Sequence, residues 1–357
     1  MTTQYPTNED IIRAAKRNLT QAGWDYLVGG TESETSMRRN RASFDVKGFR
    51  PRVLVDVSTL DTSTTILGFP TKIPVMLAPI GGLVRIHPQG PVEAAKAASE
   101  FGVIQTLSSV SGTELEEVAS QNDQAKFFQM YIQGDWDWIK KLLDRVNKAG
   151  FKGLALTVDN ARYSLRERPI RYGTTPQGLS PRTPGPGAAA TWELMSKIKE
   201  YSGLPFMVKG IATKEDARLA VDHGVDVVWV SNHGGRGLDH GMGTLDMLEE
   251  IAPEINGEAE IVADGSILRG SDVVKAISLG ANMVTIGKLQ GWGLAADGHQ
   301  GLLRVLNILE EEIISAMALL GVTSVKGLNP SYIRSAQPVT PPHEFSSWVN
   351  MPENRIV

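Results

Sequence analysis

The run Val230-Ser-Asn-His-Gly-Gly-Arg-Gly-Leu-Asp239 combines residue types that can carry out acid–base chemistry on a small anion. His233 is the natural proton acceptor near neutral pH. Arg236, three residues later, offers a planar guanidinium that matches a carboxylate with two hydrogen bonds. The glycines between them allow the backbone to approach a ligand closely. The alternative interpretation is a buried structural histidine followed by an arginine in a surface ion pair.

A second run, Thr157-Val-Asp-Asn-Ala-Arg-Tyr-Ser-Leu-Arg166, carries the complementary groups. Asp159 can orient an imidazole and stabilise its protonated form, as the aspartate of a catalytic triad does. Arg166 is a second candidate for binding a carboxylate, and its alternative interpretation is an exposed basic residue at the base of a loop. Together the two runs predict a site that positions a carboxylic acid and removes a proton from it.

The elements that must position these residues are short β-rich segments that alternate with amphipathic helical patterns. Strands are predicted at 74–78, 103–107, 126–131, 153–158, 206–209, 226–230, 260–263 and 283–286. Helices are predicted at 92–100, 114–120, 136–149, 191–201, 214–223, 245–251, 271–279 and 301–320. Eight alternating pairs indicate an α/β fold, a parallel (β/α)8 TIM barrel. Catalytic side chains of such barrels gather at the carboxyl ends of the strands.

Polar residues follow most of the predicted strands, which is where this fold places its chemistry. They are Ser108, Gln129, Tyr131, Thr157, Asp159, Lys209, Ser231, His233, Asp264, Gly287 and Lys288. Barrels often bind a phosphate between the loops after the last two strands and the start of a helix. The run Asp264–Gly270 and the pair Gly287-Lys288 occupy those two loops. We therefore expect a phosphate-bearing cofactor or substrate there.

The segments outside the alternation are expected to complete one domain spanning 1–357. Residues 1–70 form a helical N-terminal extension with helices at 8–19 and 21–28, a polar, basic stretch at 37–52, and a strand pair near 64–67. The barrel occupies 71–325 and a tail 326–357, in which Phe345 and Trp348 are expected to pack on the barrel or a neighbouring subunit. The Pro- and Gly-rich segment 169–190 is interpreted either as a lid over the catalytic face or as a surface insertion.

Composition narrows the class of protein. The net charge of −4 disfavours a nucleic-acid or anionic-membrane partner, and the absence of cysteine excludes disulfides and thiolate metal sites. No metal site is predicted. The N-terminus has no apolar signal region, and no segment approaches the ~20 apolar residues of a membrane span. We expect a cytoplasmic protein without a membrane partner.

The motifs at the successive strand ends resemble those of the FMN-dependent 2-hydroxy acid oxidases and dehydrogenases, which include glycolate oxidase, lactate oxidase and mandelate dehydrogenase. The most specific motif is SNHGGR at 231–236, and APIGG, TLSS, FFQMY, LTVD, MVKG and ADGS follow the family's order. The resemblance covers nearly the whole chain. It implies FMN as the cofactor, an (S)-2-hydroxy acid as the substrate, O2 or another electron acceptor, and a homotetramer.

The resemblance also implies roles for individual residues. His233 is the catalytic base and Asp159 holds its imidazole, while Arg236 and Arg166 bind the substrate carboxylate. Tyr26 and Tyr131 contact the substrate, and Tyr131 and Arg236 also belong to the catalytic set. The residues implied to bind FMN are Ala78, Pro79, Ile80, Ser108, Gln129, Thr157, Lys209, Ser231, Asp264, Gly265, Ser266, Arg269, Gly287 and Lys288. Whether the electrons leave as hydride or through a carbanion is left open by the sequence.

Several positions depart from the family pattern. Leu268 and Lys288 stand where arginines are usual, and Ser266 stands where a glycine is usual. Val110 replaces a bulky aromatic of glycolate oxidase, and Gly81 is shared with the mandelate-type members. We therefore expect a roomy pocket for a larger or aromatic substrate such as mandelate. Two other readings are another FMN barrel, of the type 2 isopentenyl diphosphate isomerase kind, and a flavin-binding barrel without catalysis.

Overall fold

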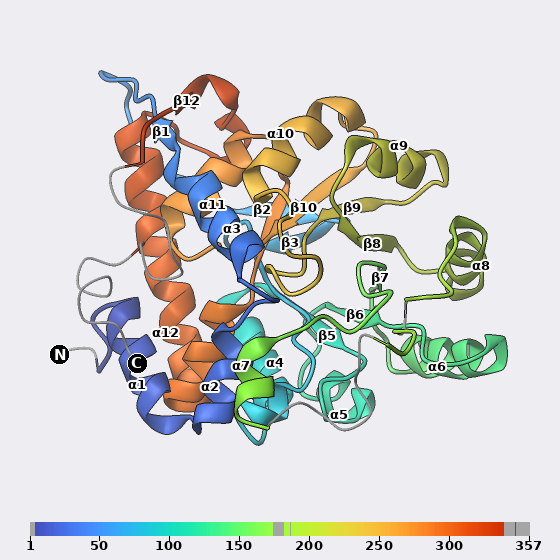
Figure 1. The fold of residues 1–357 in the computed structure, drawn as a ribbon. Coiled ribbons are helices and arrows are strands. Elements are labelled where there is room, and N and C mark those ends of the chain that lie inside the picture. The colour runs from blue at the N-terminus through green and yellow to red at the C-terminus, as the bar shows by residue number, and fades with distance from the viewer. Residues whose placement is uncertain (1–3, 174–181, 186, 339–346, 348–357) are drawn as a thin grey trace.

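The computed structural model describes residues 4–173, 182–185, 187–338 and 347. Eight parallel strands close into a barrel in the order β10-β11-β4-β5-β6-β7-β8-β9, which confirms the predicted fold (Figure 1). Their ends lie within two residues of the predicted ones. The strands are β4 (Val75–Leu77), β5 (Ile104–Ser108), β6 (Lys126–Met130), β7 (Gly153–Thr157), β8 (Phe206–Ile211), β9 (Val227–Val230), β10 (Glu260–Asp264) and β11 (Met283–Ile286).

A helix follows each barrel strand, as the alternation predicts. These helices are α4 (Gly90–Phe101), α5 (Leu115–Ala119), α6 (Trp136–Lys148), α8 (Trp192–Ser202), α9 (Lys214–Asp222), α10 (Thr244–Ile255), α11 (Gly270–Ser278) and α12 (Lys288–Leu320). The sequence placed the start of the last helix at Gly301, because the segment Leu289–Ala296 is buried on all sides and shows no amphipathic period. Non-helical torsions at Asp297 and Gly298 divide α12 into two parts.

The barrel interior explains why functional groups collect at one end. Side chains alternate between the inside and the outside of each strand. Its lower interior is filled by apolar residues such as Phe127, Met207 and Trp229, and Ile66 packs among them. Ile66 belongs to an antiparallel hairpin of β2 (Thr64–Ile66) and β3 (Phe69–Thr71), the strand pair expected from the sequence. With the hairpin at the amino end, ligands can enter only from the carboxyl ends of the strands.

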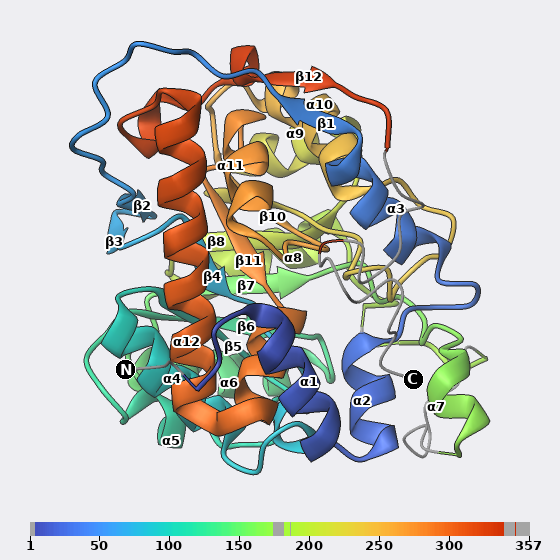
Figure 2. The ribbon, with the colours of Figure 1, turned by 90° about the vertical axis from the view of Figure 1, so that its left-hand side faces the viewer.

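The extensions of the chain cover the side of the barrel near α12. The helices α1 (Asn8–Asn18) and α2 (Gln21–Val28) were predicted, and α1 packs along α12 (Figures 1 and 2). At the other end of α12, β1 (Lys47–Phe49) pairs antiparallel with β12 (Ile333–Ser335) of the C-terminal tail. The remaining short elements are α7 (Glu167–Arg171), η1 (Leu83–Arg85), η2 (Val325–Gly327) and η3 (Pro330–Tyr332). Phe345 and Trp348 lie outside the described residues, as do residues 174–181 and 186 of the predicted lid.

The helix α3 (Thr35–Asp45) was missed in the sequence, which suggested only a polar, basic stretch there. Its buried face is largely polar and includes Ser36, Asn40, Arg41 and Ser43. These side chains bond to loops at the carboxyl ends of β9 and β10, so burial does not require apolar residues. A helix buried through hydrogen bonds has no apolar periodicity to reveal it.

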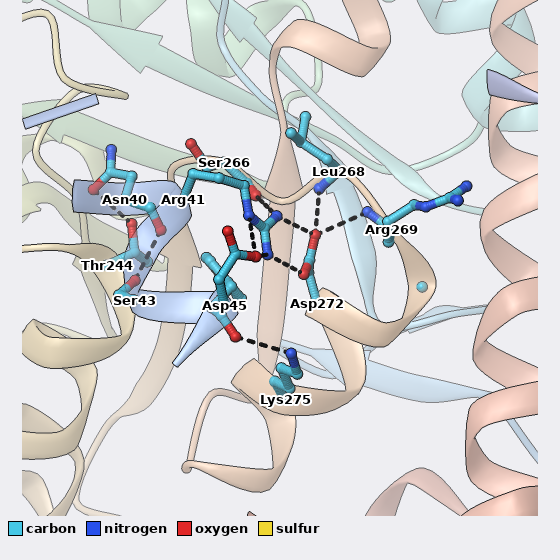
Figure 3. A network of polar contacts seen from close by, with 12 residues as sticks. Asn40, Arg41, Ser43, Asp45, Thr244, Ser266, Leu268, Arg269, Asp272 and Lys275 are labelled. Carbon is cyan, nitrogen blue, oxygen red and sulfur yellow. Dashed lines mark hydrogen bonds and ion pairs between the residues drawn. The ribbon is translucent and has the colours of Figure 1, made fainter. Parts of the chain in front are cut away.

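Arg41 fixes the loop after β10 through a buried network (Figure 3). Its guanidinium donates to both carboxylate oxygens of Asp272, at 2.8 and 2.9 Å, and to the carbonyl of Ser266 at 3.2 Å. The Asp272 carboxylate in turn accepts the backbone N–H groups of Leu268 and Arg269, each at 3.0 Å. Both charged side chains are 2% exposed. The backbone between Asp264 and Gly270 is thereby held in one conformation beside the barrel mouth.

We expect Arg41→Met to lower the free energy of unfolding by about 3–5 kcal/mol, because it leaves the Asp272 carboxylate buried and unpaired. Burial opposes ionisation of Asp272, but the charge and hydrogen bonds of Arg41 outweigh burial and lower its pKa. A carboxyl group whose pKa is lowered by folding stabilises the fold at pH values above its unfolded pKa of about 3.9. This stabilisation is lost as the pH falls through the pKa of the folded state.

Urea unfolding of wild type and variant at a series of pH values measures this effect. The stability difference should be largest near neutral pH and should shrink below about pH 4. The double variant Arg41→Met/Asp272→Met should recover part of the loss, because no charge is then left unpaired. An Arg41→Met protein as stable as wild type at pH 7 would contradict the assignment.

Candidate active site

Polar side chains form the uppermost inward-facing layer of the barrel. Lys209 on β8 donates to the Ser231 hydroxyl at 2.9 Å, and Ser231 donates to Asp264 at 2.8 Å. On the opposite side, the Ser108 hydroxyl donates to the Gln129 side-chain carbonyl at 2.8 Å. Each of these five residues lies two or four positions after an apolar residue whose side chain faces the barrel interior. This spacing is the one that the pleat of a strand requires. The period of the strands thus places this polar layer at the mouth.

A cavity of about 480 Å³ opens above this layer. Seventeen of the residues predicted for the site line it: Tyr26, Ala78, Pro79, Ile80, Gly81, Val110, Tyr131, Asp159, Arg166, Lys209, His233, Arg236, Asp264, Gly265, Ser266, Gly287 and Lys288. Four more, Ser108, Gln129, Thr157 and Ser231, are buried in the polar layer itself. The volume is in the usual range of ~300–1,000 Å³ for small-molecule sites.

His233 and Asp159 form a directly bonded pair in the cavity wall. The Nδ1 atom of His233 lies 2.7 Å from an Asp159 carboxylate oxygen. The other ring nitrogen, Nε2, lies 3.3 Å from the Tyr131 hydroxyl. Because an ionised carboxylate accepts hydrogen bonds only, Nδ1 carries the proton and Nε2 has the free electron pair. Nε2 is therefore the atom available to remove a proton from a ligand.

The electrostatics favour one protonation state of Asp159 and one of Tyr131. Burial disfavours the charged form of Asp159, but the charges of His233 and Lys209 outweigh it and lower its pKa. Burial, followed by the negative charge of Asp159, raises the pKa of the Tyr131 hydroxyl well above its usual value. At neutral pH Asp159 is therefore a carboxylate and Tyr131 a neutral hydrogen-bond donor.

The backbone at His233 is strained in a way that aims the imidazole. His233 has a φ of +60°, a conformation that costs a non-glycine residue about 1–3 kcal/mol. Its backbone N–H donates to the Ser231 hydroxyl at 3.0 Å, which helps to hold the turn. The next residue but one, Gly235, has a φ of +77°, and a Cβ there would lie 2.5 Å from the Met37 backbone. Only glycine at position 235 therefore allows the turn to pack this closely against helix α3.

Two guanidinium groups stand beside His233. Arg236 donates to the backbone carbonyls of Tyr26, Leu27 and Gly29, so it ties the end of α2 to the active site. Arg166 donates to the Ser164 hydroxyl at 3.3 Å. Burial and the nearby charge of Arg166 lower the pKa of Arg236 to about 10. Burial is the larger cause of this shift, and the remainder reflects the proximity of two like charges, which a bound carboxylate would relieve.

Arg269 is not brought to the cavity, in contrast to the role expected for it. Its guanidinium pairs with Glu312 on α12 at 2.6 Å, and the Gly270 N–H donates to the same carboxylate at 2.6 Å. The Arg269 side chain is therefore directed toward α12 and not toward the cavity. The residues of the loop after β10 that do line the cavity are Gly265, Ser266, Ile267 and Leu268, and Lys288 lines it from the start of α12.

Some lining residues were not predicted. Thr285 lies two residues beyond Met283 on β11, and its buried hydroxyl has no partner among the described residues. The two-residue period could have identified it. Arg85, Arg162 and Tyr163 also line the cavity, from the loops after β4 and β7. No periodic signal marks a loop residue, so only the fold reveals them.

None of the helices in the described ranges has both the length and the apolar character needed to cross a membrane.

Comparison with known proteins gives consistent matches over almost the whole chain. The model of the family described as FMN-dependent dehydrogenase matches residues 15–185 and 182–335. Glycolate oxidase of Spinacia oleracea is 38% identical over 342 residues, which cover 89% of this chain and 93% of that protein. L-Lactate oxidase of Nostoc sp. is 37% identical over 347 residues, covering 89% of this chain and 95% of that protein. A crystal structure of mandelate oxidase superimposes with a TM-score of 0.88 at 34% identity, covering 94% of this chain and all of that one.

Proposed function

Since the chain belongs to the FMN-dependent dehydrogenase family, with glycolate and lactate oxidases among its relatives, we propose that it oxidises an (S)-2-hydroxy acid to the 2-oxo acid. The observation that carries the proposal is the His233–Asp159 pair beside Arg166 and Arg236 in one cavity wall. This set provides a base and a carboxylate-binding group within the same pocket, which a binding module would not need.

The donors of the cavity fit the cofactor of the family. Gln129 Nε2 and Thr157 Oγ1 are buried and have no partner among the described residues, so they can bond to the polar edge of the flavin ring. Lys209 supplies a buried positive charge in the same layer. At the other end, Gly287 and Lys288 begin α12, where a helix N-terminus favours a phosphate. These residues would hold FMN between the polar layer and the loops after β10 and β11.

The chain's own residues account for the acid–base part of the reaction. Arg166 and Arg236 bind the substrate carboxylate and thereby fix the orientation of C2, a form of positioning that can be worth several kcal/mol. Nε2 of His233 removes a proton from the substrate, and the Asp159 carboxylate stabilises the imidazolium that results. Tyr131, which stays protonated, donates a hydrogen bond beside Nε2. FMN, when bound, would accept the two electrons of the C2–H bond together with the second hydrogen of the alcohol, which is the redox chemistry that the cofactor supplies.

A spectroscopic titration of the holoenzyme tests the proposal. A panel of 2-hydroxy acids is added without oxygen while the visible flavin band is recorded, and air is then admitted. Bleaching by a hydroxy acid is the expected result, and recovery of the band in air would identify an oxidase rather than a dehydrogenase. A bound flavin that no hydroxy acid bleaches would contradict the proposal and favour an isomerase-type or a non-catalytic flavoprotein.

We propose a larger or aromatic acid, such as mandelate, as the preferred substrate, because the pocket wall carries Gly81 opposite Val110. A Cβ on Gly81 would lie 2.9 Å from Cγ2 of Val110, closer than van der Waals contact allows. Gly81→Ala should therefore lower kcat/KM for mandelate relative to lactate, by roughly tenfold for one added methyl group.

Steady-state kinetics with both acids measure this ratio. The double variant Gly81→Ala/Val110→Ala removes the clash and should restore the preference for mandelate. A wild-type enzyme that turned over lactate or glycolate far faster than mandelate would contradict the proposed substrate size.

We also propose a homotetramer, which the exposed apolar side chains near α12 support. Val53 and Leu54 are 82% and 103% exposed, and Leu319 on α12 is 75% exposed. Apolar groups of this size are covered in most soluble proteins when they lie close together. Sedimentation velocity at several concentrations tests the proposal, and a monomer at all of them would overturn it.

A further inference from the structure

Cationic side chains outnumber carboxylates around the cavity. The described cationic lining residues are Arg85, Arg162, Arg166, Lys209, Arg236 and Lys288, whereas the described carboxylates are Asp159 and Asp264. Both carboxylates already have partners, because Asp159 bonds to His233 at 2.7 Å and Asp264 lies 3.4 Å from the Lys209 ammonium. The cavity is therefore built for ligands with several negative charges.

The proposed function accounts for only part of this positive charge. Lys209 and Lys288 face the cofactor, and Arg166 and Arg236 face the first carboxylate of the substrate. Of the two arginines that remain, Arg162 donates to the backbone carbonyl of Arg182 at 3.1 Å. The guanidinium of Arg85 has no hydrogen bond or ion pair to any described residue, and its carbon lies 5.5 Å from the centroid of the Tyr26 ring.

The position of Arg85 is set by the backbone and does not depend on its own side chain. It ends η1, the turn that follows β4, and its N–H donates to the Gly82 carbonyl at 2.9 Å. The turn is fastened to the loop after β5 by two backbone bonds, from Gly82 N to Val110 O at 2.6 Å and from Val84 N to Ser111 O at 3.3 Å. Arg85 is thus held at the rim by the same loop that carries Val110.

Tyr26 connects Arg85 to the reacting end of the pocket. The ring of Tyr26 lies 5.5 Å from the Arg85 guanidinium and 5.7 Å from that of Arg236. The same aromatic ring therefore contacts both the guanidinium group assigned to the first carboxylate and a second guanidinium group. A substrate side chain that follows this ring leads from C2 toward Arg85.

On the basis of the proposed function, we infer that the substrate carries a second anionic group at the end of its side chain and that Arg85 binds it. The substrate class is a 2-hydroxy acid with a distal carboxylate, on an aromatic ring or on an aliphatic chain. A guanidinium on an aromatic ring, with no protein acceptor among the described residues, can offer two parallel hydrogen bonds to such a carboxylate. Arg85 is exposed, so with a neutral side chain in the pocket only water would solvate its guanidinium.

Matched pairs of substrates test the inference. They are 4-carboxymandelate against 4-methylmandelate, and 2-hydroxyadipate against 2-hydroxyhexanoate, so that each pair differs mainly in the distal charge. We expect the charged member to have a kcat/KM about tenfold higher, through one charge-assisted contact. The Kd of the matching 2-oxo diacid, measured by calorimetry, should be lower by a similar factor than that of the neutral 2-oxo acid. High salt should reduce both preferences.

Variants at Arg85 assign the preference to this residue. Arg85→Met keeps the apolar stem against Tyr26 and should abolish the preference for the charged member of each pair. Arg17→Met removes an exposed arginine on α1, away from the cavity, and should leave the preference intact. Arg85→Glu should reverse it in favour of 4-(aminomethyl)mandelate.

These outcomes distinguish a failure of the inference about Arg85 from a failure of the proposed function. If neutral hydroxy acids bleach the flavin as well as the charged ones do, or if the preference survives in Arg85→Met, the inference about Arg85 is wrong while the proposed function stands. If no hydroxy acid of either kind bleaches the flavin, the proposed function fails and the inference fails with it.

Discussion

His233→Asn should lower the rate constant for flavin reduction by a 2-hydroxy acid by about 10²–10⁴-fold, which is the range expected for loss of a general base. The side chain of asparagine has no basic nitrogen to replace Nε2. Asparagine is nevertheless among the few non-glycine residues that tolerate a left-handed backbone, so the φ of +60° at this position can be kept. The turn, and the cofactor site beside it, should therefore be preserved.

Single-turnover reduction without oxygen measures this rate constant directly. The visible spectrum and the Kd of FMN serve as controls, and both should match those of the wild type. Asp159→Asn should also give a large loss, because it removes the carboxylate that stabilises the imidazolium and holds the proton on Nδ1. A His233→Asn enzyme reduced within tenfold of the wild-type rate would assign the base to another residue.

Arg236→Met should lower kcat/KM by about 10²–10³-fold, since loss of one partner from a buried, charged contact costs about 2–5 kcal/mol. The guanidinium has two duties in the structure. It is placed to bind the substrate carboxylate, and it donates to the carbonyls of Tyr26, Leu27 and Gly29. Methionine leaves those carbonyls without a donor, so part of the loss can come from movement of α2.

Arg166→Met separates the two roles, because among the described residues Arg166 donates a hydrogen bond to the side chain of Ser164 and none to the end of α2. Both variants should raise KM for the hydroxy acid, but only Arg236→Met should also lower the melting temperature. Arg236→Lys should restore the positive charge but not the fork, so it should recover only part of kcat/KM. An unchanged kcat/KM in both methionine variants would mean that the carboxylate binds elsewhere.

Much of the fold and of the site follows from local sequence. The alternation of eight short β-rich segments with amphipathic helices predicts a barrel, and the fold class indicates that its polar groups lie at the carboxyl ends of the strands. The polar layer could be predicted from the sequence, because its members lie at the carboxyl ends of predicted strands: Gln129, Thr157, Lys209 and Asp264. The part of α12 before Gly301 was not predicted, because a fully buried helix lacks the amphipathic period on which the prediction depends.

The tertiary structure decided the partners of the long charged side chains. Arg41 meets Asp272 across 231 positions of sequence, and Arg236 reaches the carbonyls at the end of α2 across more than 200. Arg269, expected beside a phosphate, instead pairs with Glu312. Arg85 had no sequence signal and yet lies at the rim beside Tyr26. The backbone period determines the direction in which a side chain leaves its strand or helix. The partner of a long, flexible arginine or lysine side chain depends instead on which distant segment folds within its reach.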